Sequence, residues 1–464
     1  MLKSLFLVAG TAATLLMGST ALRAETLADA MISAYRNSNL LEQNRATLRA
    51  ADENVAQAVS ALRPVIEWTA QYGWSKNDTN VTTASGVPID TTVEGTSAST
   101  ALSATMTLFD FGRNRLTISS QKEAVLATRE SLRSIEQQVL LATVQAYSDV
   151  KSAQEQVSIN QNSVRVLQEE LNATNDRFEV GEVTRTDVSL AESQRAAARA
   201  ALVSAQGSLQ TAREDYKAAT GHYPVDLAPL PAAPNLPRSR DEASSTAQRN
   251  HPTIKSLQHS VLVSELGIKS AQAEKRPLIT GSLSVSNDKG GYVGQSAGIN
   301  MTQQLYTGGK LDSGYRQAVA NRDETRAQLR QASVEVTQAV LQSYALIDVY
   351  KAQISAYGEQ IRAAQVAYDG VREEATLGAR TTLDVLDAEQ DLLDARAARI
   401  DSQAQLQVAY YQLLSNMGLL TVENLKLGIP TYDPAAYYNA VQNAPLTSVQ
   451  GDSLDRVLRA IGKK

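Results

Sequence analysis

The sequence predicts a mainly α-helical fold with a small β part, in which one strand–strand–long-helix unit occurs twice. Three observations carry this prediction: an internal repeat at constant spacing, two stretches of more than sixty residues without proline, and short segments that alternate apolar and polar residues. The composition agrees with it. Aromatic residues make up only 5% of the 464 residues, whereas a thick globular core usually contains more large apolar side chains.

The internal repeat is the strongest of these signals. Gly181 and Gly378 are 197 residues apart, and the same offset holds for the other repeated positions. Upstream, Arg63-Pro64 matches Arg276-Pro277 at an offset of 213, so the first copy carries 16 extra residues. Such self-similarity indicates one supersecondary unit used twice. The positions that recur are Leu108, Gly112, Tyr147, Gly181, Asp187, Glu192, Arg199, Leu209 and Gly221.

The repeat also divides the chain. Residues 1–24 are typical of a signal peptide, because Lys3 precedes a short apolar run and Ala24 ends a plausible cleavage site. Five of the twelve prolines fall between the copies and predict a semi-rigid extended linker. The predicted organisation is therefore: signal peptide 1–24; first repeat 25–221, with a β-hairpin at 65–110; linker 222–240; second repeat 241–420, with a β-hairpin at 278–306; C-terminal segment and tail 421–464.

Two segments predict helices that are too long for a compact globular domain. Residues 114–180 contain neither proline nor glycine and place apolar residues at helical spacing. Some sixty helical residues would span about 90 Å. The second copy, 310–377, lacks proline, although Gly314, Gly358 and Gly370 weaken it locally. Each long helix then meets a glycine, Gly181 or Gly378, and is expected to turn back into a helix of about forty residues.

Four segments of about ten residues alternate apolar and polar side chains. In 65–75, Trp68, Tyr72 and Trp74 share one face and Glu67 lies on the other. Segments 98–109, 278–288 and 293–302 alternate in the same way. This length crosses a bilayer when a strand is tilted, and aromatic residues near strand ends suit the membrane interfaces. The polar stretch 76–97 is expected to be an external loop. A four-stranded sheet outside the membrane, with one wet face, fits the alternation equally well.

If the strands lie in a membrane, one chain is not enough. Open strand edges are not tolerated in lipid, and small membrane barrels begin at about eight strands. Four strands per chain must therefore be completed by an oligomer. A dimer would supply eight strands and a trimer twelve, and the residues alone leave both open.

The composition excludes several classes of function. The chain has no cysteine, which excludes disulfides, thiolate metal sites and a lipid-anchored cysteine. The formal net charge of −5 gives no basic surface for nucleic acid. His222, His251 and His259 make no metal motif, and no nucleophile motif is present. We therefore expect neither an enzyme nor a cofactor.

Several motifs together resemble one known family. Phe111-Gly112-Arg113 and Gly308-Gly309-Lys310 follow the second strand of each unit, and the segment 382–388 reads Thr-Leu-Asp-Val-Leu-Asp-Ala. Over essentially the whole mature chain the sequence is similar to the TolC-like outer-membrane factors. This resemblance implies a homotrimer in the outer membrane, with a 12-stranded transmembrane β-barrel continued by a periplasmic α-helical barrel. It also implies two partners, a periplasmic adaptor and an inner-membrane transporter of the ABC or RND type, for type I protein secretion or small-molecule efflux.

The resemblance also assigns roles to residues at the two glycine turns. It places Asp384 and Asp387 at a cation-selective pore constriction, and Arg380 with Asp187 in a salt bridge that keeps the tip closed. The residues themselves show that Asp384 and Asp387 lie one helical turn apart. For Asp187 and Asp384, capping of a helix start is an alternative, because each follows a threonine by three positions. The expected adaptor-contacting residues are Val180, Gly181, Thr184, Leu377, Gly378 and Thr381.

Two rival functions fit parts of the sequence. A periplasmic adaptor-like coiled-coil protein of a transport complex would have one helical hairpin and small β-domains. A purely structural coiled coil of the cell envelope would lack Trp68, Trp74 and the alternating strands. Two β-hairpins of membrane character favour the channel over both.

Overall fold

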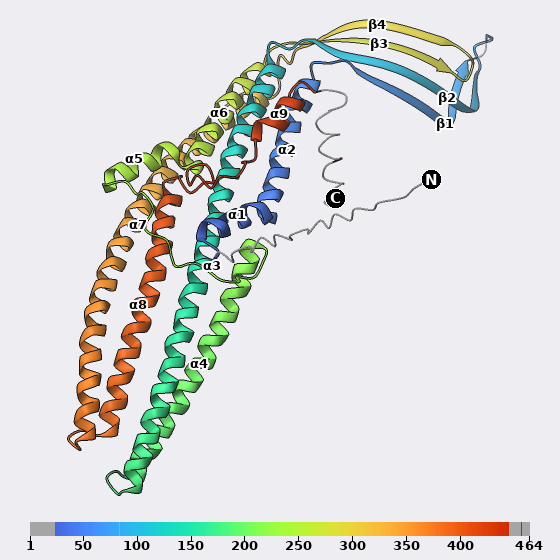
Figure 1. The fold of residues 1–464 in the computed structure, drawn as a ribbon. Coiled ribbons are helices and arrows are strands. Elements are labelled where there is room, and N and C mark those ends of the chain that lie inside the picture. Colours follow the sequence, from blue (N-terminus) through green and yellow to red (C-terminus); the bar gives the residue numbers. More distant parts are fainter. Residues whose placement is uncertain (1–23, 83, 445–455, 457–464) are drawn as a thin grey trace, which may run out of the picture.

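The computed structural model describes residues 24–82, 84–444 and 456. The predicted signal peptide therefore lies outside the described residues except for Ala24, and so do residues 445–455 and 457–464 of the predicted C-terminal segment and tail. A four-stranded sheet stands at one end of the molecule, and two long helical hairpins reach away from it (Figure 1).

The two halves contain the same succession of helices. Two short helices precede each hairpin of strands, and a long helix and its return helix follow. Both long helices, α3 and α7, have 67 residues, about 100 Å of helix. None of the described helices combines the length and apolar character needed to cross a membrane. The first half contains α1 (Leu27–Asn37), α2 (Asn39–Ser60), α3 (Arg113–Glu179) and α4 (Arg185–Thr220); the second contains α5 (Arg240–Asn250), α6 (Pro252–Ala273), α7 (Lys310–Thr376) and α8 (Thr382–Asn416), and α9 (Pro434–Val441) follows.

The glycines within α7 do not interrupt it. A Cβ atom added at Gly314, Gly358 or Gly370 would meet no other atom, so none of the three marks a close approach of another backbone. Each costs about 1 kcal/mol of helix propensity relative to alanine. Packing against α6 and α8 along the helix offsets this cost.

Equivalent residues make equivalent contacts in the two halves. Gly221 ends α4 in the left-handed region (φ 89°), and a Cβ there would lie 3.0 Å from Asn37. Gly418, the equivalent glycine after α8, packs against the backbone of Asn250, where a Cβ would lie 2.6 Å away. Tyr147 and Tyr344 donate hydrogen bonds to backbone carbonyls of the proline-rich segment between the halves. That segment is therefore held by both halves.

The largest group of buried apolar side chains lies in the middle of the molecule, where α1 and α5 pack against the long helices. Leu140, Tyr147, Tyr216 and Leu413 are fully buried there. Toward the free ends of the hairpins the buried groups are small, such as Leu171 with two neighbours between α3 and α4. Most of the chain's own apolar packing therefore lies far from the tips.

The four strands form one antiparallel sheet in the order β1-β2-β3-β4. The strands are β1 (Val65–Thr82), β2 (Pro88–Phe109), β3 (Leu278–Asp288) and β4 (Val293–Thr302). The register shifts once, between Thr107 and Phe109 of β2. β1 and β4 are the two edges of the sheet.

The first hairpin is longer than the sequence predicts. Residues 76–97 were expected to form a loop, but pairing of β1 with β2 continues to Thr82 and Pro88. Cross-strand polar contacts hold the extension, because Lys76 pairs with Glu94 at 2.6 Å and Thr92 donates to Asp78 at 2.7 Å. Threonine and valine favour strands whether or not one face is apolar, so the loss of alternation does not mark the end of a strand.

Candidate functional site

The pairing register gives the sheet one apolar face. Directly opposed residues of antiparallel strands lie on the same face, and one continuous row consists of Ile66, Ala104, Leu283 and Ala297. The row on one side consists of Trp68, Leu102 and Val285 and ends at Gln295, and the row on the other side adds Met106 and Ile299.

The opposite face is polar. The row between the two apolar rows consists of Glu67, Ser103, Ser284 and Ser296. The hydroxyl groups of Ser284 and Ser296 lie 3.0 Å apart and form a hydrogen bond across β3 and β4. A sheet with one apolar and one polar face can separate lipid from water.

The apolar face is uncovered in the single chain. Trp68 is 69% exposed, Tyr72 75% and Trp74 63%. Burying a large aromatic side chain is worth several kcal/mol, so this surface needs an apolar environment. The apolar side chains of β1 run from Ile66 to Trp74, and the next position on the same face is the ion-paired Lys76. About nine residues is the length of a tilted strand that crosses a bilayer.

Each helical hairpin turns at a glycine with positive φ. Gly181 has φ 83° and Gly378 has φ 76°, the left-handed region that costs other residues about 1–2 kcal/mol. Both turns end a helix in the same way. The N–H of Glu182 bonds to Arg177 O at 2.9 Å, and the N–H of Ala379 bonds to Glu374 O at 2.9 Å, as in a Schellman motif.

The residues beside these glycines are exposed apolar side chains. Val180 is 71% exposed and Leu377 is 80% exposed. A Cβ atom added at Gly181 or Gly378 would meet no other atom, so positive φ alone explains these glycines. The tips thus present apolar groups on rigid turns.

A capping box starts each return helix. Thr184 and Asp187 exchange hydrogen bonds at the start of α4, and Thr381 and Asp384 do the same at the start of α8. The backbone N–H of Thr381 lies 2.9 Å from Asp384 Oδ2. These hydrogen bonds hold the pKa values of both carboxyl groups below the ordinary value of 3.8. Asp187 and Asp384 therefore cap their helices in the structure, as the alternative interpretation predicts.

Arg380 pairs with a residue of its own hairpin. Its Nε lies 2.9 Å from Glu374 Oε2, and this hydrogen bond raises the pKa of the guanidinium. Among the described residues of one chain, Arg380 and Asp187 form no ion pair, because Asp187 bonds to Thr184 and belongs to the other hairpin. Their predicted salt bridge could form only between hairpins brought together by assembly, and it stays a prediction.

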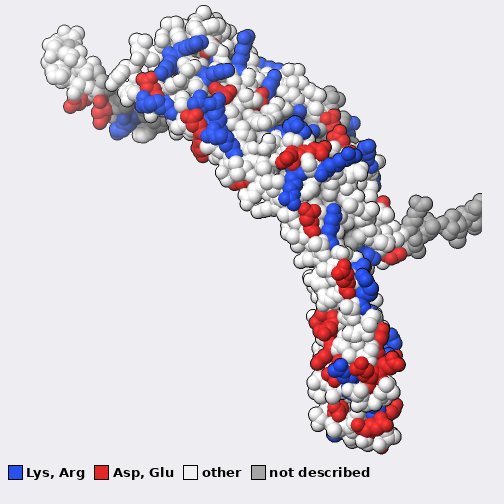
Figure 2. Space-filling view, turned by 90° about the vertical axis from the view of Figure 1, so that its left-hand side faces the viewer, with Lys and Arg blue, Asp and Glu red and all other residues white. Residues whose placement is uncertain are grey.

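Asp387 belongs to a longer acidic row that the sequence analysis missed. Asp384, Asp387, Asp391 and Asp394 of α8 are spaced 3, 4 and 3 residues apart, which places all four on one side of the helix. Asp387, Asp391 and Asp394 are exposed. In Figure 2, which views the molecule from the α7–α8 side, acidic side chains gather over the lower end of this hairpin. The 3–4–3 spacing was the signal that could have found Asp391 and Asp394.

A row of carboxylates differs from a built metal site. The described residues contain no group of three His, Asp or Glu side chains placed to hold a metal ion. The row along α8 instead creates a region of negative potential, which attracts cations without fixing one of them.

The amphipathic sheet and the long helical hairpins define a class of protein: an outer-membrane export channel that extends into the periplasm. The model of the outer membrane efflux protein family matches residues 32–222 and 243–419, and the chain belongs to this family. It is 34% identical to the outer membrane efflux protein BepC of Brucella suis over 93% of each chain. It is 26% identical to the outer membrane protein TolC of Salmonella enteritidis over 88% of this chain and 84% of that one.

A solved structure of CusC has the same fold, with a TM-score of 0.75, 19% identity, and 84% of this chain and 92% of that chain covered. The TolC-like resemblance, the fold class and the outer-membrane location predicted from sequence are thereby confirmed. The family match favours an export channel over the adaptor-like alternative.

Proposed function

We propose that three copies of the chain close into one continuous duct, with twelve strands in the outer membrane and the helical hairpins below. The edges of the sheet carry this proposal. β1 and β4 are the two edge strands, and open edges in lipid would leave backbone groups without hydrogen-bond partners. Pairing of β4 with β1 of a neighbouring copy satisfies both edges.

The space needed inside the barrel favours three copies over two. Two copies would give eight strands, and a barrel of that size is filled by its own side chains. Three copies give twelve strands, and twelve is the smallest multiple of four strands that leaves an open lumen. The polar row with Glu67, Ser103, Ser284 and Ser296 would line this lumen.

At the far end, the acidic row of α8 would form the constriction. In a trimer, Asp387 contributes three carboxylates around the axis, and Asp384 contributes three more beside them. Rings of carboxylates select cations. Asp384 also caps its helix, so Asp387 is the residue expected to determine selectivity. Arg380 and Asp187 of adjoining hairpins would keep the tips together.

The apolar tips supply a docking surface for a periplasmic adaptor. Val180, Leu377 and the two rigid glycine turns are exposed, and Thr184 and Thr381 lie beside them. The adaptor would link the duct to an inner-membrane transporter of the ABC or RND type, which supplies the energy. Both protein secretion and small-molecule efflux use such a conduit.

Cross-linking tests the proposed closure, and the absence of cysteine makes the chain suitable for it. Cysteines placed at Thr69 in β1 and Ser296 in β4, both on the polar-face register, should be joined between copies by a bifunctional thiol reagent of about 10 Å. A ladder of products that ends at three chains is expected. A control with both cysteines in β2, at Ser99 and Ser103, should give no ladder. A ladder that ends at two chains would refute the twelve-stranded barrel. The lack of any ladder with the cysteines at Thr69 and Ser296 would also refute it.

A further inference from the structure

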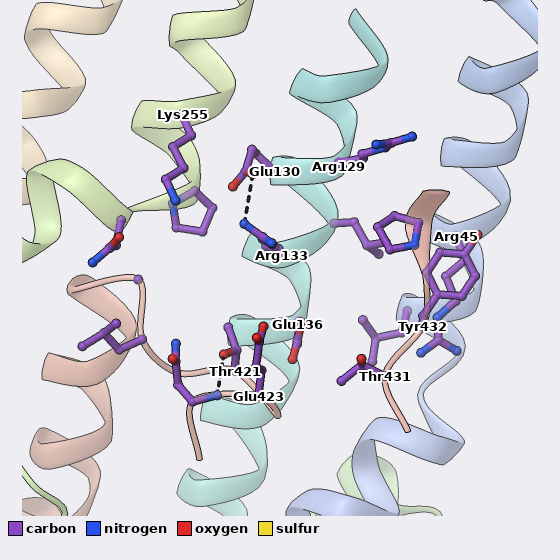
Figure 3. A pocket seen from close by; sticks show the side chains of 18 of the residues that line it. Arg45, Arg129, Glu130, Arg133, Glu136, Lys255, Thr421, Glu423, Thr431 and Tyr432 are labelled. Atoms are coloured by element: carbon purple, nitrogen blue, oxygen red, sulfur yellow. Dashed lines mark hydrogen bonds and ion pairs between the residues drawn. The ribbon is translucent and has the colours of Figure 1, made fainter. Parts of the chain in front are cut away.

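A cavity of ≈ 540 Å³ lies where α2, α3 and α6 meet the segment that follows α8. Figure 3 shows the side chains around it. Neither the sheet nor the tips include this cavity, and nothing in the proposed duct uses it. Its volume lies in the range of small-molecule sites. Apolar side chains form part of the lining, together with the rings of Tyr35 and Tyr432.

Four cationic side chains from three helices line the cavity: Arg45, Arg129, Arg133 and Lys255. Two of them are held in place by aromatic rings. The guanidinium of Arg45 lies 5.2 Å from the centroids of both Tyr35 and Tyr432, and that of Arg129 lies 5.1 Å from the ring centroid of Tyr438. Stacking on these rings orients both guanidinium groups at the cavity wall.

Acidic side chains balance part of this charge, and Arg45 pairs with Glu42 at 3.5 Å. Glu130 pairs with Arg133 at 3.1 Å, and Glu136 accepts a hydrogen bond from the N–H of Val422 at 2.8 Å. Burial raises the pKa of Glu136. Glu423 is exposed.

Lys255 is the free cation of this group. Within the described part of the chain it has no ion-pair partner, while His259 beside it pairs with Glu123 at 2.8 Å. Lys255 also lies near the start of α6, whose first helical residue is Pro252. The N-terminal end of a helix carries a partial positive charge, which adds to that of the lysine. Lys255 therefore gives the cavity one positive charge, unpaired among the described residues, that can attract an anionic group.

The position of the cavity restricts the source of that group. The lining residues of α3, Leu126 to Glu136, follow the start of α3 at Arg113 by roughly 13 to 23 residues, or about 20–35 Å along the helix. The interfacial region of a bilayer adds only about 5–8 Å on each side of the hydrocarbon. A lipid phosphate in the membrane would not reach the cavity, so the ligand comes from the periplasm.

We propose that this cavity binds a carboxylate of the peptide stems of peptidoglycan, and so attaches the duct to the cell wall. Planar guanidinium groups suit carboxylates. The amide side chains of Asn250 and Asn424, also in the lining, can bond to peptide groups or sugar hydroxyls. A carboxylate-bearing glycopeptide combines both features.

Binding of a soluble disaccharide-tetrapeptide muropeptide to the full mature protein in detergent tests the proposal by calorimetry. Lys255→Gln should weaken binding by roughly ten- to a hundredfold, because a hydrogen bond between charged groups is worth about 1.5–3 kcal/mol. Lys255→Arg should restore most of the affinity. Lys269→Gln removes an exposed cation of the same helix outside the cavity and should leave binding unchanged.

Three outcomes would overturn the proposal. The first is no binding of the muropeptide at millimolar concentration by protein that retains its oligomeric state. The second is an equal loss in Lys255→Gln and Lys269→Gln, which would indicate unspecific attraction. The third is binding of inorganic phosphate without binding of the muropeptide, which would assign the cavity to a different anion.

Discussion

The two helical hairpins of the chain have the same geometry and different chemistry. Both have a first helix of 67 residues, a left-handed glycine at the turn and a Thr–Asp capping box at the start of the return helix. In α8, Asp387, Asp391 and Asp394 follow the capping residue Asp384 on the same side of the helix. At the equivalent positions, α4 has Leu190, Gln194 and Ala197.

This difference distinguishes the residues that form the hairpin from those of the proposed constriction. The residues that build the turn, Gly181 and Gly378 with their threonines, occur in both hairpins, because each hairpin must reverse direction in the same way. The carboxylates beyond the first turn occur in one hairpin only, so helix formation does not explain them. In the proposed trimer, α8 rather than α4 would therefore determine which ions pass.

The largest effect is expected from the acidic row. Asp387→Asn should weaken block by multivalent cations by roughly tenfold or more, because one substitution removes three converging charges in a trimer. Leu190→Asn, at the equivalent position of α4, should leave the block unchanged. Titration of the block in planar bilayers measures both. Equal block in wild type and Asp387→Asn would remove this residue from the constriction.

The turns should respond equally in the two hairpins. Gly181→Ala and Gly378→Ala each force a left-handed conformation on a residue with a Cβ, at a cost of about 1–2 kcal/mol. Hydrogen exchange at the two tips should show a similar loss of protection for both variants. A large loss in one hairpin alone would mean that its glycine serves another purpose, such as a contact with a partner.

A smaller effect is expected from Arg380. Arg380→Ser removes its hydrogen bond with Glu374 and the proposed contact with Asp187 of an adjoining hairpin. Because an exposed ion pair contributes little free energy, we expect conductance to rise only about twofold. Glu374→Ala is the matched control, because it removes only the contact seen within one chain. If both variants raise conductance equally, Asp187 takes no part in closing the tips.

The smallest effect is a pH dependence shared by both hairpins. The capping bonds hold the pKa values of Asp187 and Asp384 below 3.8. Their contribution to stability is therefore fully present above pH 3.8 and is lost as the pH falls through the lower folded values. The hydrogen-exchange protection factors of the first turns of α4 and α8, which are corrected for the intrinsic exchange rate, should fall together below that pH. In Thr381→Ala, the α8 turn alone should exchange faster already at neutral pH.

Much of the fold follows from local sequence signals. The repeat, the two glycine turns, the long helices and the strand pairs all leave a local pattern, and the structure contains each of them. The first hairpin was predicted too short, because Lys76 and Glu94 pair across strands without apolar alternation. The contact of Gly418 with Asn250 leaves no local sign, since only the fold brings them together. The constriction was predicted at Asp384 and Asp387 and stays a prediction, and Asp391 and Asp394 were missed because the family resemblance points only to the first two carboxylates.

Ion selectivity tests the central claim most directly, namely that the acidic row of α8 lines the narrowest part of the duct. The reversal potential of the reconstituted protein under a potassium chloride gradient should show cation selectivity. The triple variant Asp387→Asn, Asp391→Asn, Asp394→Asn should shift it strongly toward zero or anion selectivity. An unchanged reversal potential in the triple variant, with conductance intact, would contradict the account.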